Sequence, residues 1–186
     1  MNKFNLFSVR ICKNKKYKNL KKRYNIYPNL VNRNFKIKKE NSTWFTDITY
    51  LKYNQEWRFL SPIMDGKTKN IVAYNFGKCN NWNLVEKTLK KAIKKVPVRS
   101  DLILHSDQGT QYTSNKYRDF CRKNNITISM SRKGNPWDNA IIENFFSSLK
   151  KEVTYNQSFK SMNHYLNAIK EWIKFYNTDR VRFTKF

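Results

Sequence analysis

The sequence predicts an α/β domain built on one mixed five-stranded sheet with helices on both faces. Three observations favour this class. Residues 44–78 hold three strand-like segments joined by short turns, which is typical of an antiparallel meander. Residues 80–131 alternate helix, strand, helix and strand, and the chain beyond them to residue 177 has helical patterns. Strands that return through helices pair in parallel, so we expect three antiparallel strands followed by two parallel ones.

The first three strands are rich in β-branched and aromatic residues, and the first of them alternates apolar and polar side chains. Their sequences are WFTDITYLKY (44–53), EWRFLSPIMD (56–65) and KNIVAYNFGK (69–78). Asn54-Gln55 and Gly66-Lys67 supply the turns between them. Asp65 directly precedes Gly66, and we interpret it as a structural carboxylate that starts a turn.

Helical spacing of apolar residues and breakers at the ends predict the helices. The segments are NNWNLVEKTLKKAIKK (80–95), SNKYRDFCRKNN (114–125) with Ser114 as N-cap, a helix from Asn139 that follows the breakers Gly134 to Pro136, and SFKSMNHYLNAIKEWIKFYN (158–177). In the last helix the inward residues are expected to be Tyr165, Leu166, Ile169, Trp172, Ile173 and Tyr176. DLILHSD (101–107) and ITISMS (126–131) are the two remaining strands.

The charge of the chain indicates a polyanionic partner. Its 186 residues carry 38 Lys or Arg against 13 Asp or Glu, a net charge of +25. Each basic side chain that neutralises a phosphate releases a counterion, so nucleic acid is the natural partner. No stretch approaches the roughly 18 apolar residues of a spanning helix, and FNLFSV near the start is too short for a signal peptide. We therefore expect a cytoplasmic protein with no membrane association.

Cysteine and histidine usage argues against a disulfide or a zinc site. Cys12, Cys79 and Cys121 are scattered and odd in number, without the spacing of a metal-binding pair. His105 and His164 are too few and too far apart to build a zinc site. We expect reduced thiols in packing positions.

Composition divides the chain into three regions. Residues 1–40 hold 13 Lys or Arg against the single acid Glu40 and lack a regular period, so we expect an extended or weakly ordered basic arm. Residues 41–156 form the α/β core, and 157–186 form a C-terminal helix with a short tail. The tyrosines interleaved with the basic residues of the arm are suited to stacking on bases, although a solvated tail is the alternative. They are Tyr17, Tyr24 and Tyr27.

Three carboxylates are candidates for metal chemistry. Asp47 lies within the first strand, where an unpaired buried charge is costly, and Asp107 ends a hydrophobic strand, where open sheets present functional groups. Glu143 lies near the start of a helix and shares a face with Ser147 and Lys150. Such acids would bind one or two Mg²⁺ or Mn²⁺ ions, with phosphates completing the shell. An ordinary exposed Glu is the alternative for Glu143 alone.

Three segments carry a resemblance to a known family. TDITY, HSDQGTQYTS and GNPWDNAIIENFFSSLKKE resemble the three acidic motifs of the bacterial insertion-sequence-three family of transposases. Thirty-five residues separate Asp107 from Glu143, as in the D, D, 35, E pattern of that family's ribonuclease-H-like integrase core. The resemblance implies that Asp47, Asp107 and Glu143 bind the metal and catalyse cleavage of the 3′ end of the element, whose hydroxyl then attacks another phosphodiester, with no covalent enzyme intermediate.

The resemblance also implies partners. They are DNA, as the terminal repeats of the element and as its target, further copies of the chain when the two ends are held together, and a protein from an upstream reading frame. Localisation would then be at the bacterial nucleoid.

The neighbours of the acids have both functional and structural readings. The residues expected to contact DNA are Gln108, Gln111, Lys133, Trp137, Lys150 and Lys151. A solvated Lys and a packed Trp are the alternatives for Lys150 and Trp137. Asp138 precedes the catalytic helix and is expected to be its N-cap; alternatively, it supports the catalytic acids without contacting the metal. His105 is expected either to support Asp107, whose side chain lies on the same face of the strand, or to be a packed core histidine.

Two departures from the family pattern motivate a rival hypothesis. The basic arm stands where a helix-turn-helix region is expected to be ending, so we interpret it as the remnant of a DNA-binding region. The tail YNTDRVRFTKF resembles a YNxxRxH motif, with Arg182 in the place of the histidine. A truncated, inactive transposase that only binds DNA is therefore the alternative. A basic structural protein without chemistry is a third class, and the acidic motifs argue against it.

Overall fold

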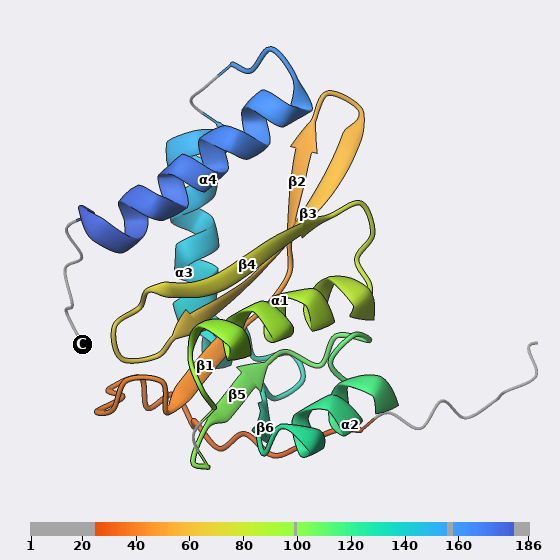
Figure 1. Ribbon diagram of the computed structural model, residues 1–186, viewed down its shortest axis with the longest axis vertical. Coiled ribbons are helices and arrows are strands. Elements are labelled where there is room, and N and C mark those ends of the chain that lie inside the picture. Colours follow the sequence, from red (N-terminus) through yellow and green to blue (C-terminus); the bar gives the residue numbers. More distant parts are fainter. Residues whose placement is uncertain (1–24, 99, 156–157, 181–186) are drawn as a thin grey trace, which may run out of the picture.

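The computed structural model describes residues 25–98, 100–155 and 158–180. In order, their elements are β1 (Thr43–Thr46), β2 (Thr49–Tyr53), β3 (Glu56–Asp65), β4 (Ile71–Gly77), α1 (Trp82–Lys95), β5 (Ile103–Ser106), α2 (Asn115–Lys123), β6 (Thr127–Met130), a 3₁₀ turn η1 (Pro136–Asn139), α3 (Ala140–Leu149), a π-helical turn η2 (Lys150–Thr154) and α4 (Met162–Thr178) (Figure 1). The predicted helices and strands are all present among them. None of these helices is long and apolar enough to cross a membrane.

The strands form one mixed sheet. β3 pairs antiparallel with β1, β2 and β4, and β5 pairs parallel with both β1 and β6. The mixed architecture confirms the predicted fold class. The described part of the chain has six strands where we expected five, because the first predicted strand is split into β1 and β2.

The split has a local cause at Asp47. Thr46 lies opposite Ile63 and Thr49 opposite Leu60, so the register is continuous across the gap and Ser61 and Pro62 are the intervening β3 residues. Pro62 has no N–H to give to a ladder. On the other strand the Ile48 N–H donates to Asp47 Oδ1 at 2.7 Å. The hydrogen-bond ladder between the two strands is therefore interrupted at Asp47 and Ile48.

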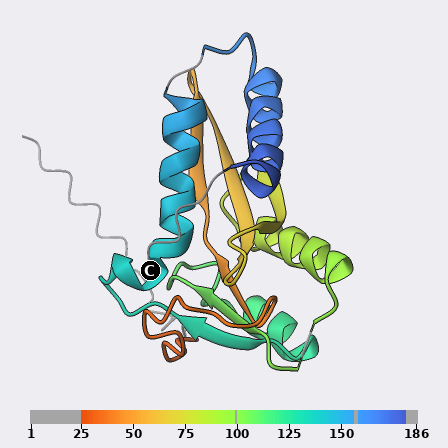
Figure 2. The same cartoon turned by 90° about the vertical axis from the view of Figure 1, so that its left-hand side faces the viewer.

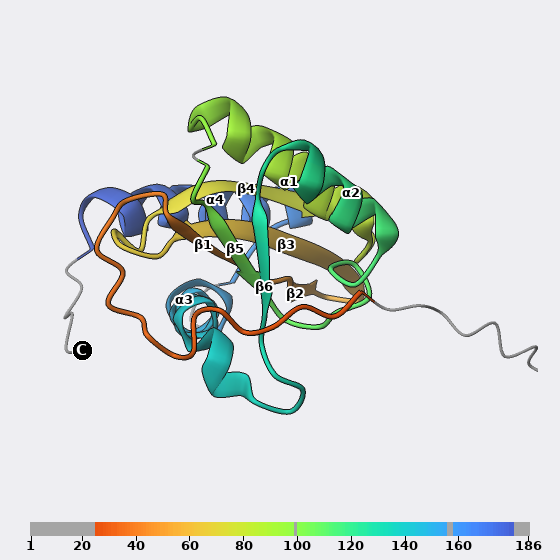
Figure 3. The same ribbon diagram turned by 90° about the horizontal axis from the view of Figure 1, so that it is seen from below.

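Helices cover the sheet on both faces and build two apolar cores. One core joins Phe45, Leu51 and Leu60 to the inner sides of α3 and α4. The other joins Trp44 and Leu104 to α1 and α2. Seen from below, α1 and α2 lie above the sheet and α3 beneath it (Figure 3), and in the side view α3 and α4 run alongside the long β2–β3 strands (Figure 2). Of the residues predicted to face inward in α4, only Leu166 is partly exposed rather than buried.

Residues 25–40 pack against the core, although their composition groups them with the basic arm. The Met130 N–H donates to the Pro28 carbonyl at 3.3 Å, and the Leu30 N–H donates to Ser129 Oγ at 2.9 Å. Val31 is buried in the α3–α4 core. The segment therefore contacts the end of β6, which it crosses in Figure 3. Residues 1–24 of the predicted arm, with Tyr17 and Tyr24, lie outside the described residues, as does Arg182 of the tail.

The described end of the chain is fastened to the sheet and to η2. The Asn177 side chain accepts from the Ile71 N–H at 2.8 Å and donates to the Ile71 carbonyl at 3.0 Å, on β4. Arg180 pairs with Glu152 at 2.6 Å, and its guanidinium lies 5.5 Å from the Tyr176 ring centroid. Tyr176 itself packs on the Phe145 ring at 5.0 Å. α4 is thus continuous with the core in packing.

Candidate active site

A cleft of about 460 Å³ opens beside the carboxyl ends of β1 and β5 and the start of α3. All three predicted catalytic acids line it, namely Asp47, Asp107 and Glu143. The loop from Ser131 to Pro136, which joins β6 to η1, forms a wall. The structure therefore brings together three carboxylates that come from two strands and a helix.

Asp47 is held without a matching cation. Burial, and next the charge of Asp107, raise the pKa of Asp47 to about 7. The Ile48 N–H and, more weakly, Lys150 act in the opposite direction, and Glu143 adds to the repulsion. Ionising the Asp47 carboxyl therefore costs free energy in the folded protein, and a cation bound nearby would offset that cost.

Asp107 follows the last residue of β5 and begins a tight loop. The Gly109 N–H donates to Asp107 Oδ1 at 2.9 Å. A Cβ at position 109 would stand 2.9 Å from both Asp107 Oδ1 and Gln111 Oε1, so any larger residue there would force the ends of these two side chains to shift. Burial raises the pKa of Asp107 as well. Two adjacent acids of the cleft are therefore both biased toward protonation.

Glu143 reaches the cleft from the exposed side of α3. Its neighbours Ile142, Phe145 and Phe146 are buried and hold the opposite side of the helix on the core. Burial raises the pKa of Glu143. The charge of Glu143 acts on Asp47 less than that of Asp107 does. Within the described residues no three acidic, histidine or cysteine side chains already converge as a metal-binding group.

The donors of the cleft fit a hard divalent cation. Carboxylate oxygens are the ligands that Mg²⁺ and Mn²⁺ prefer, and here burial and the neighbouring acids raise the pKa of Asp47 more than the Ile48 N–H and Lys150 lower it. Asn139 also lines the cleft and is 2% exposed, yet neither its amide nitrogen nor its amide oxygen has a hydrogen-bond partner. A buried amide without partners is costly, so this site is suited to a polar ligand.

The predicted DNA-contacting residues are divided by the structure. Gln108 and Lys133 line the cleft, and Gln108 Nε2 donates to the Ser131 carbonyl at 3.0 Å. Gln111 lies outside the lining and bonds Asn80. Trp137 is 71% exposed, so it is not a packed core residue. Lys150 is half-buried and acts on Asp47, whereas Lys151 is exposed.

His105 is a buried histidine of the core. Its Nδ1 lies 2.8 Å from Ser129 Oγ and its Nε2 lies 3.1 Å from Ser131 Oγ. Burial lowers its pKa to about 4, so the ring is neutral at physiological pH. Both ring nitrogens are engaged by serines rather than by Asp107. His105 therefore contacts the cleft lining through Ser131, and Asp138 also acts on its pKa, in the upward direction.

Asp138 does not cap the catalytic helix, so that prediction was wrong. It lies inside η1, and the N-cap residue of α3 is Asn139, whose side chain makes no capping bond. The Asp138 carboxylate is instead taken up by Arg33 at 2.7 Å and Arg132 at 2.8 Å. Long-range pairing has displaced the local capping role.

The structural interpretation of Asp65 is confirmed. Its carboxylate accepts from the Asn41 N–H at 2.8 Å, the Thr68 N–H at 2.9 Å and the Thr68 hydroxyl at 2.8 Å. It is 2% exposed, and all these contacts lie in turns. Asp65 therefore closes the β3–β4 turn onto the segment before β1.

Sequence reasoning missed several residues of the cleft. Arg132, Asn135 and Asn139 line it. The signal for Asn139 was present, because it precedes Glu143 by one helical turn and so shares its face. For Arg132 the position between a strand and the breaker cluster was the available signal.

Comparison with known proteins is consistent with this geometry. A family model described as an integrase core domain matches residues 38–136, and a second model with the same description matches residues 124–181. The putative transposase InsK of insertion element IS150 from Escherichia coli K12 is 37% identical over 154 residues, which cover 83% of this chain and 54% of that protein. A transposase-like protein of Haemophilus influenzae is 36% identical over 172 residues, covering 92% of this chain and 79% of the relative.

Solved structures agree on the fold. The chain matches one in the simian T-cell lymphotropic virus intasome with a TM-score of 0.66 at 20% identity, over 88% of this chain and 55% of that chain. It matches the HTLV-2 integrase catalytic core in complex with magnesium with a TM-score of 0.61 at 18% identity, over 77% and 90%. The fold is thus the ribonuclease-H-like one of retroviral integrase cores. The family matches and the insertion-element relatives together show that the chain belongs to the integrase core domain family, among the transposases of bacterial insertion sequences.

Proposed function

We propose that this domain is the catalytic core of a transposase that cuts the 3′ end of its DNA element and joins that end to new DNA. The observation that carries the proposal is the single cleft that gathers Asp47, Asp107 and Glu143 within a chain of net charge +25. The chain has few acidic residues, and three of them line one cleft, where they repel one another. A cation bound in the cleft would relieve this repulsion. DNA phosphates account for the basic charge elsewhere.

The acids would hold one or two Mg²⁺ or Mn²⁺ ions, with Asp47 and Asp107 as the strand-borne pair. Such ions activate a water or a 3′-hydroxyl and stabilise the leaving oxygen of an in-line displacement. Glu143 stands on an exposed helix face, so it would turn toward the aspartates when their charge is neutralised. The buried amide of Asn139 would bond the polar ligand that enters between them.

Other residues of the chain would place the DNA. Lys133 and Gln108 line the cleft, and Lys150 and Lys151 stand at the far end of α3 and just beyond it, where phosphates on either side of the scissile bond would pass. Exposed Trp137 would stack on a base at the rim. Terminal repeats and target DNA, other copies of the chain and a protein from an upstream reading frame are the partners this activity predicts, at the bacterial nucleoid.

The proposal is tested on DNA taken from either end of the element that carries this gene. With Mg²⁺ or Mn²⁺ we expect nicking at the 3′ end, followed by strand transfer. Asp107→Asn should lower the nicking rate by roughly 10³-fold or more, because one metal ligand is lost, while DNA affinity changes little among so many basic contacts.

Three outcomes separate the hypotheses. Metal-dependent nicking that is lost in Asp107→Asn supports the transposase core. Tight, salt-sensitive DNA binding with no nicking by the unsubstituted chain supports the truncated protein that only binds DNA. Equal loss of DNA binding and of nicking in Asp107→Asn would show that Asp107 serves the fold rather than the chemistry.

A further inference from the structure

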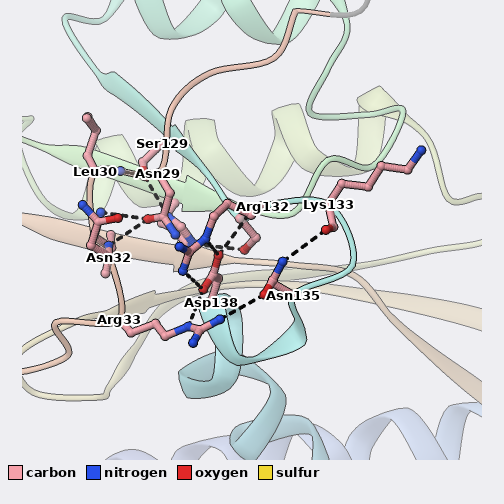
Figure 4. A network of polar contacts seen from close by, with 12 residues as sticks. Asn29, Leu30, Asn32, Arg33, Ser129, Arg132, Lys133, Asn135 and Asp138 are labelled. Carbon is pink, nitrogen blue, oxygen red and sulfur yellow. Dashed lines mark hydrogen bonds and ion pairs between the residues drawn. The ribbon is translucent and has the colours of Figure 1, made fainter.

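One buried carboxylate joins three separate parts of the cleft's surroundings. Asp138 is fully buried, and its Oδ1 accepts from Arg33 Nε at 2.7 Å, in the N-terminal segment. Arg132, at the end of β6, donates to the same carboxylate through Nε and a terminal nitrogen, each at 2.8 Å, and through its backbone N–H at 3.1 Å. Figure 4 shows both guanidinium groups directed at Asp138.

The Arg33 side chain is aimed by a specific turn. Asn32 and Arg33 both have left-handed backbone conformations, with φ of 48° and 60°. Asn adopts this region readily, but an Arg rarely does, so surrounding contacts are needed to hold Arg33 there. The Asn29 side chain supplies such contacts by accepting from the N–H groups of Val31 at 3.0 Å and Asn32 at 2.9 Å. The strained turn and the ion pair therefore stabilise each other.

Arg33 Nε bonds Asp138, and a terminal nitrogen of the same guanidinium contacts the cleft wall. A terminal nitrogen of Arg33 donates to Asn135 Oδ1 at 3.0 Å, and Asn135 Nδ2 donates to the Lys133 carbonyl at 3.2 Å. Asn135 and Lys133 both line the cleft. Arg33 thus bonds the wall loop and η1 at the same time, with the fixed fork that a guanidinium provides.

We propose that Arg33 is a positioning residue for catalysis. By holding Asp138 and Asn135 together, it fixes the wall loop and η1, which carries Asn139, and through them the first turn of α3, which carries Glu143. The inference rests on the proposed function for its kinetic part. A catalytic core that is taken to begin at residue 41 lacks this contact, although its own sheet and helices are complete.

Arg33→Ala tests this, with Arg122→Ala as the matched control. Arg122 is 81% exposed on α2 and pairs with Asp119 at 3.6 Å, away from the cleft lining. In DNA-free protein, hydrogen exchange of backbone amides from residue 132 to residue 143 should become roughly tenfold faster or more in Arg33→Ala, and unchanged in the control. Thermal unfolding should show that both variants remain folded.

The kinetic arm separates positioning from DNA contact. We expect kcat for nicking to fall by roughly tenfold or more in Arg33→Ala, because a small displacement of a catalytic group is costly, with KM for DNA within about threefold of the control. Arg33→Lys keeps the charge but cannot span Asp138 and Asn135 together, so its exchange and its kcat should be intermediate.

Two results would overturn the inference. Unchanged exchange in Arg33→Ala would show that the wall and α3 do not depend on Arg33. A higher KM with unchanged kcat, restored fully by Arg33→Lys, would make Arg33 a simple phosphate contact. The hydrogen-exchange measurement needs no DNA and no turnover. It therefore tests the positioning role of Arg33 even if the protein does not nick DNA.

Discussion

Asp47 lines the cleft and Asp138 is buried in η1, next to the cleft wall, and the surroundings of the two carboxylates are opposite. Two guanidiniums face Asp138, and the hydrogen bonds from Arg132 foremost hold its pKa far below the usual range. Another acid faces Asp47, and burial raises its pKa to about 7. The Asp138 carboxyl is therefore ionised at neutral pH, whereas the Asp47 carboxyl is only partly ionised there.

The contrast separates a structural carboxylate from a functional one. A charge whose partners are all protein groups holds elements together and needs nothing from outside. A charge held next to like charges destabilises the empty protein and is stabilised by the arrival of a cation. The same residue type therefore serves assembly in one place and ligand binding in the other.

The largest expected difference is in stability at high pH. Because the folded pKa of Asp47 lies above its usual value of 3.8, the folded protein binds the extra proton, so stability is lost as pH rises from about 4 to about 7. That loss is on the order of 4 kcal/mol. Asp47→Asn keeps an oxygen for the Ile48 N–H and removes the charge, so at pH 8 without metal it should be more stable by about this amount, while nicking is abolished.

Urea unfolding at pH 5 and pH 8, with and without Mg²⁺, checks this. The gain from Asp47→Asn should be roughly 40% of its full size at pH 5, because the loss begins near pH 4, and complete at pH 8. Mg²⁺ should stabilise the unsubstituted protein and have little effect on the variant. A variant that is less stable at both pH values would mean that Asp47 is a structural acid like Asp138.

The second prediction is a loss of stability, where Asp47→Asn is expected to give a gain. Asp138→Asn should cost about 1–3 kcal/mol at pH 7, because charged hydrogen bonds from two arginines are lost at a buried position. Its folded pKa is depressed, so its contribution is present above about pH 4 and is lost as pH falls further.

Asp119→Asn is the matched control for Asp138→Asn. Asp119 also faces two arginines, Arg118 at 3.0 Å and Arg122 at 3.6 Å, but its side chain is 47% exposed. Exposed pairs contribute little, so a loss of no more than about 1 kcal/mol is expected in urea unfolding. Equal losses at both sites would remove the distinction that burial makes.

The smallest expected effect concerns Lys150, which lowers the pKa of Asp47 more weakly than any other group named for it. Lys150→Ala should therefore move the apparent pKa of Asp47 slightly upward. The pH at which stability falls reports this shift. An unchanged pKa would mean that the ammonium of Lys150 lies too far from Asp47 to act on it, and a downward shift would contradict the prediction outright.

The sequence predicted the parts of the molecule that depend on local patterns. Periodicity located the helices and strands, and Asp107 and Glu143 were found because a strand end and a helix start are local features. The split of the first strand was missed because Pro62, on the neighbouring strand, contributes to it.

Long-range pairing explains the other errors. Asp138 was predicted to cap its own helix, since a cap is the local option for an Asp at that position. Its partner Arg33 is 105 residues away in the sequence, and no period or motif indicates such a contact. For the same reason residues 25–40 were grouped by charge with the arm, although Val31 is buried in the core.

The C-terminal YN and Arg of the tail have a meaning that the motif alone does not convey. Asn177 takes the place of a neighbouring strand for Ile71, Tyr176 fills the core, and Arg180 ties the end of α4 to Glu152. Natural variation at these three positions should accordingly track growth temperature and folding yield, and be indifferent to which DNA ends an element carries. Substitutions at these three positions between two related transposases would then not indicate whether each transposase recognises the DNA ends of the other element.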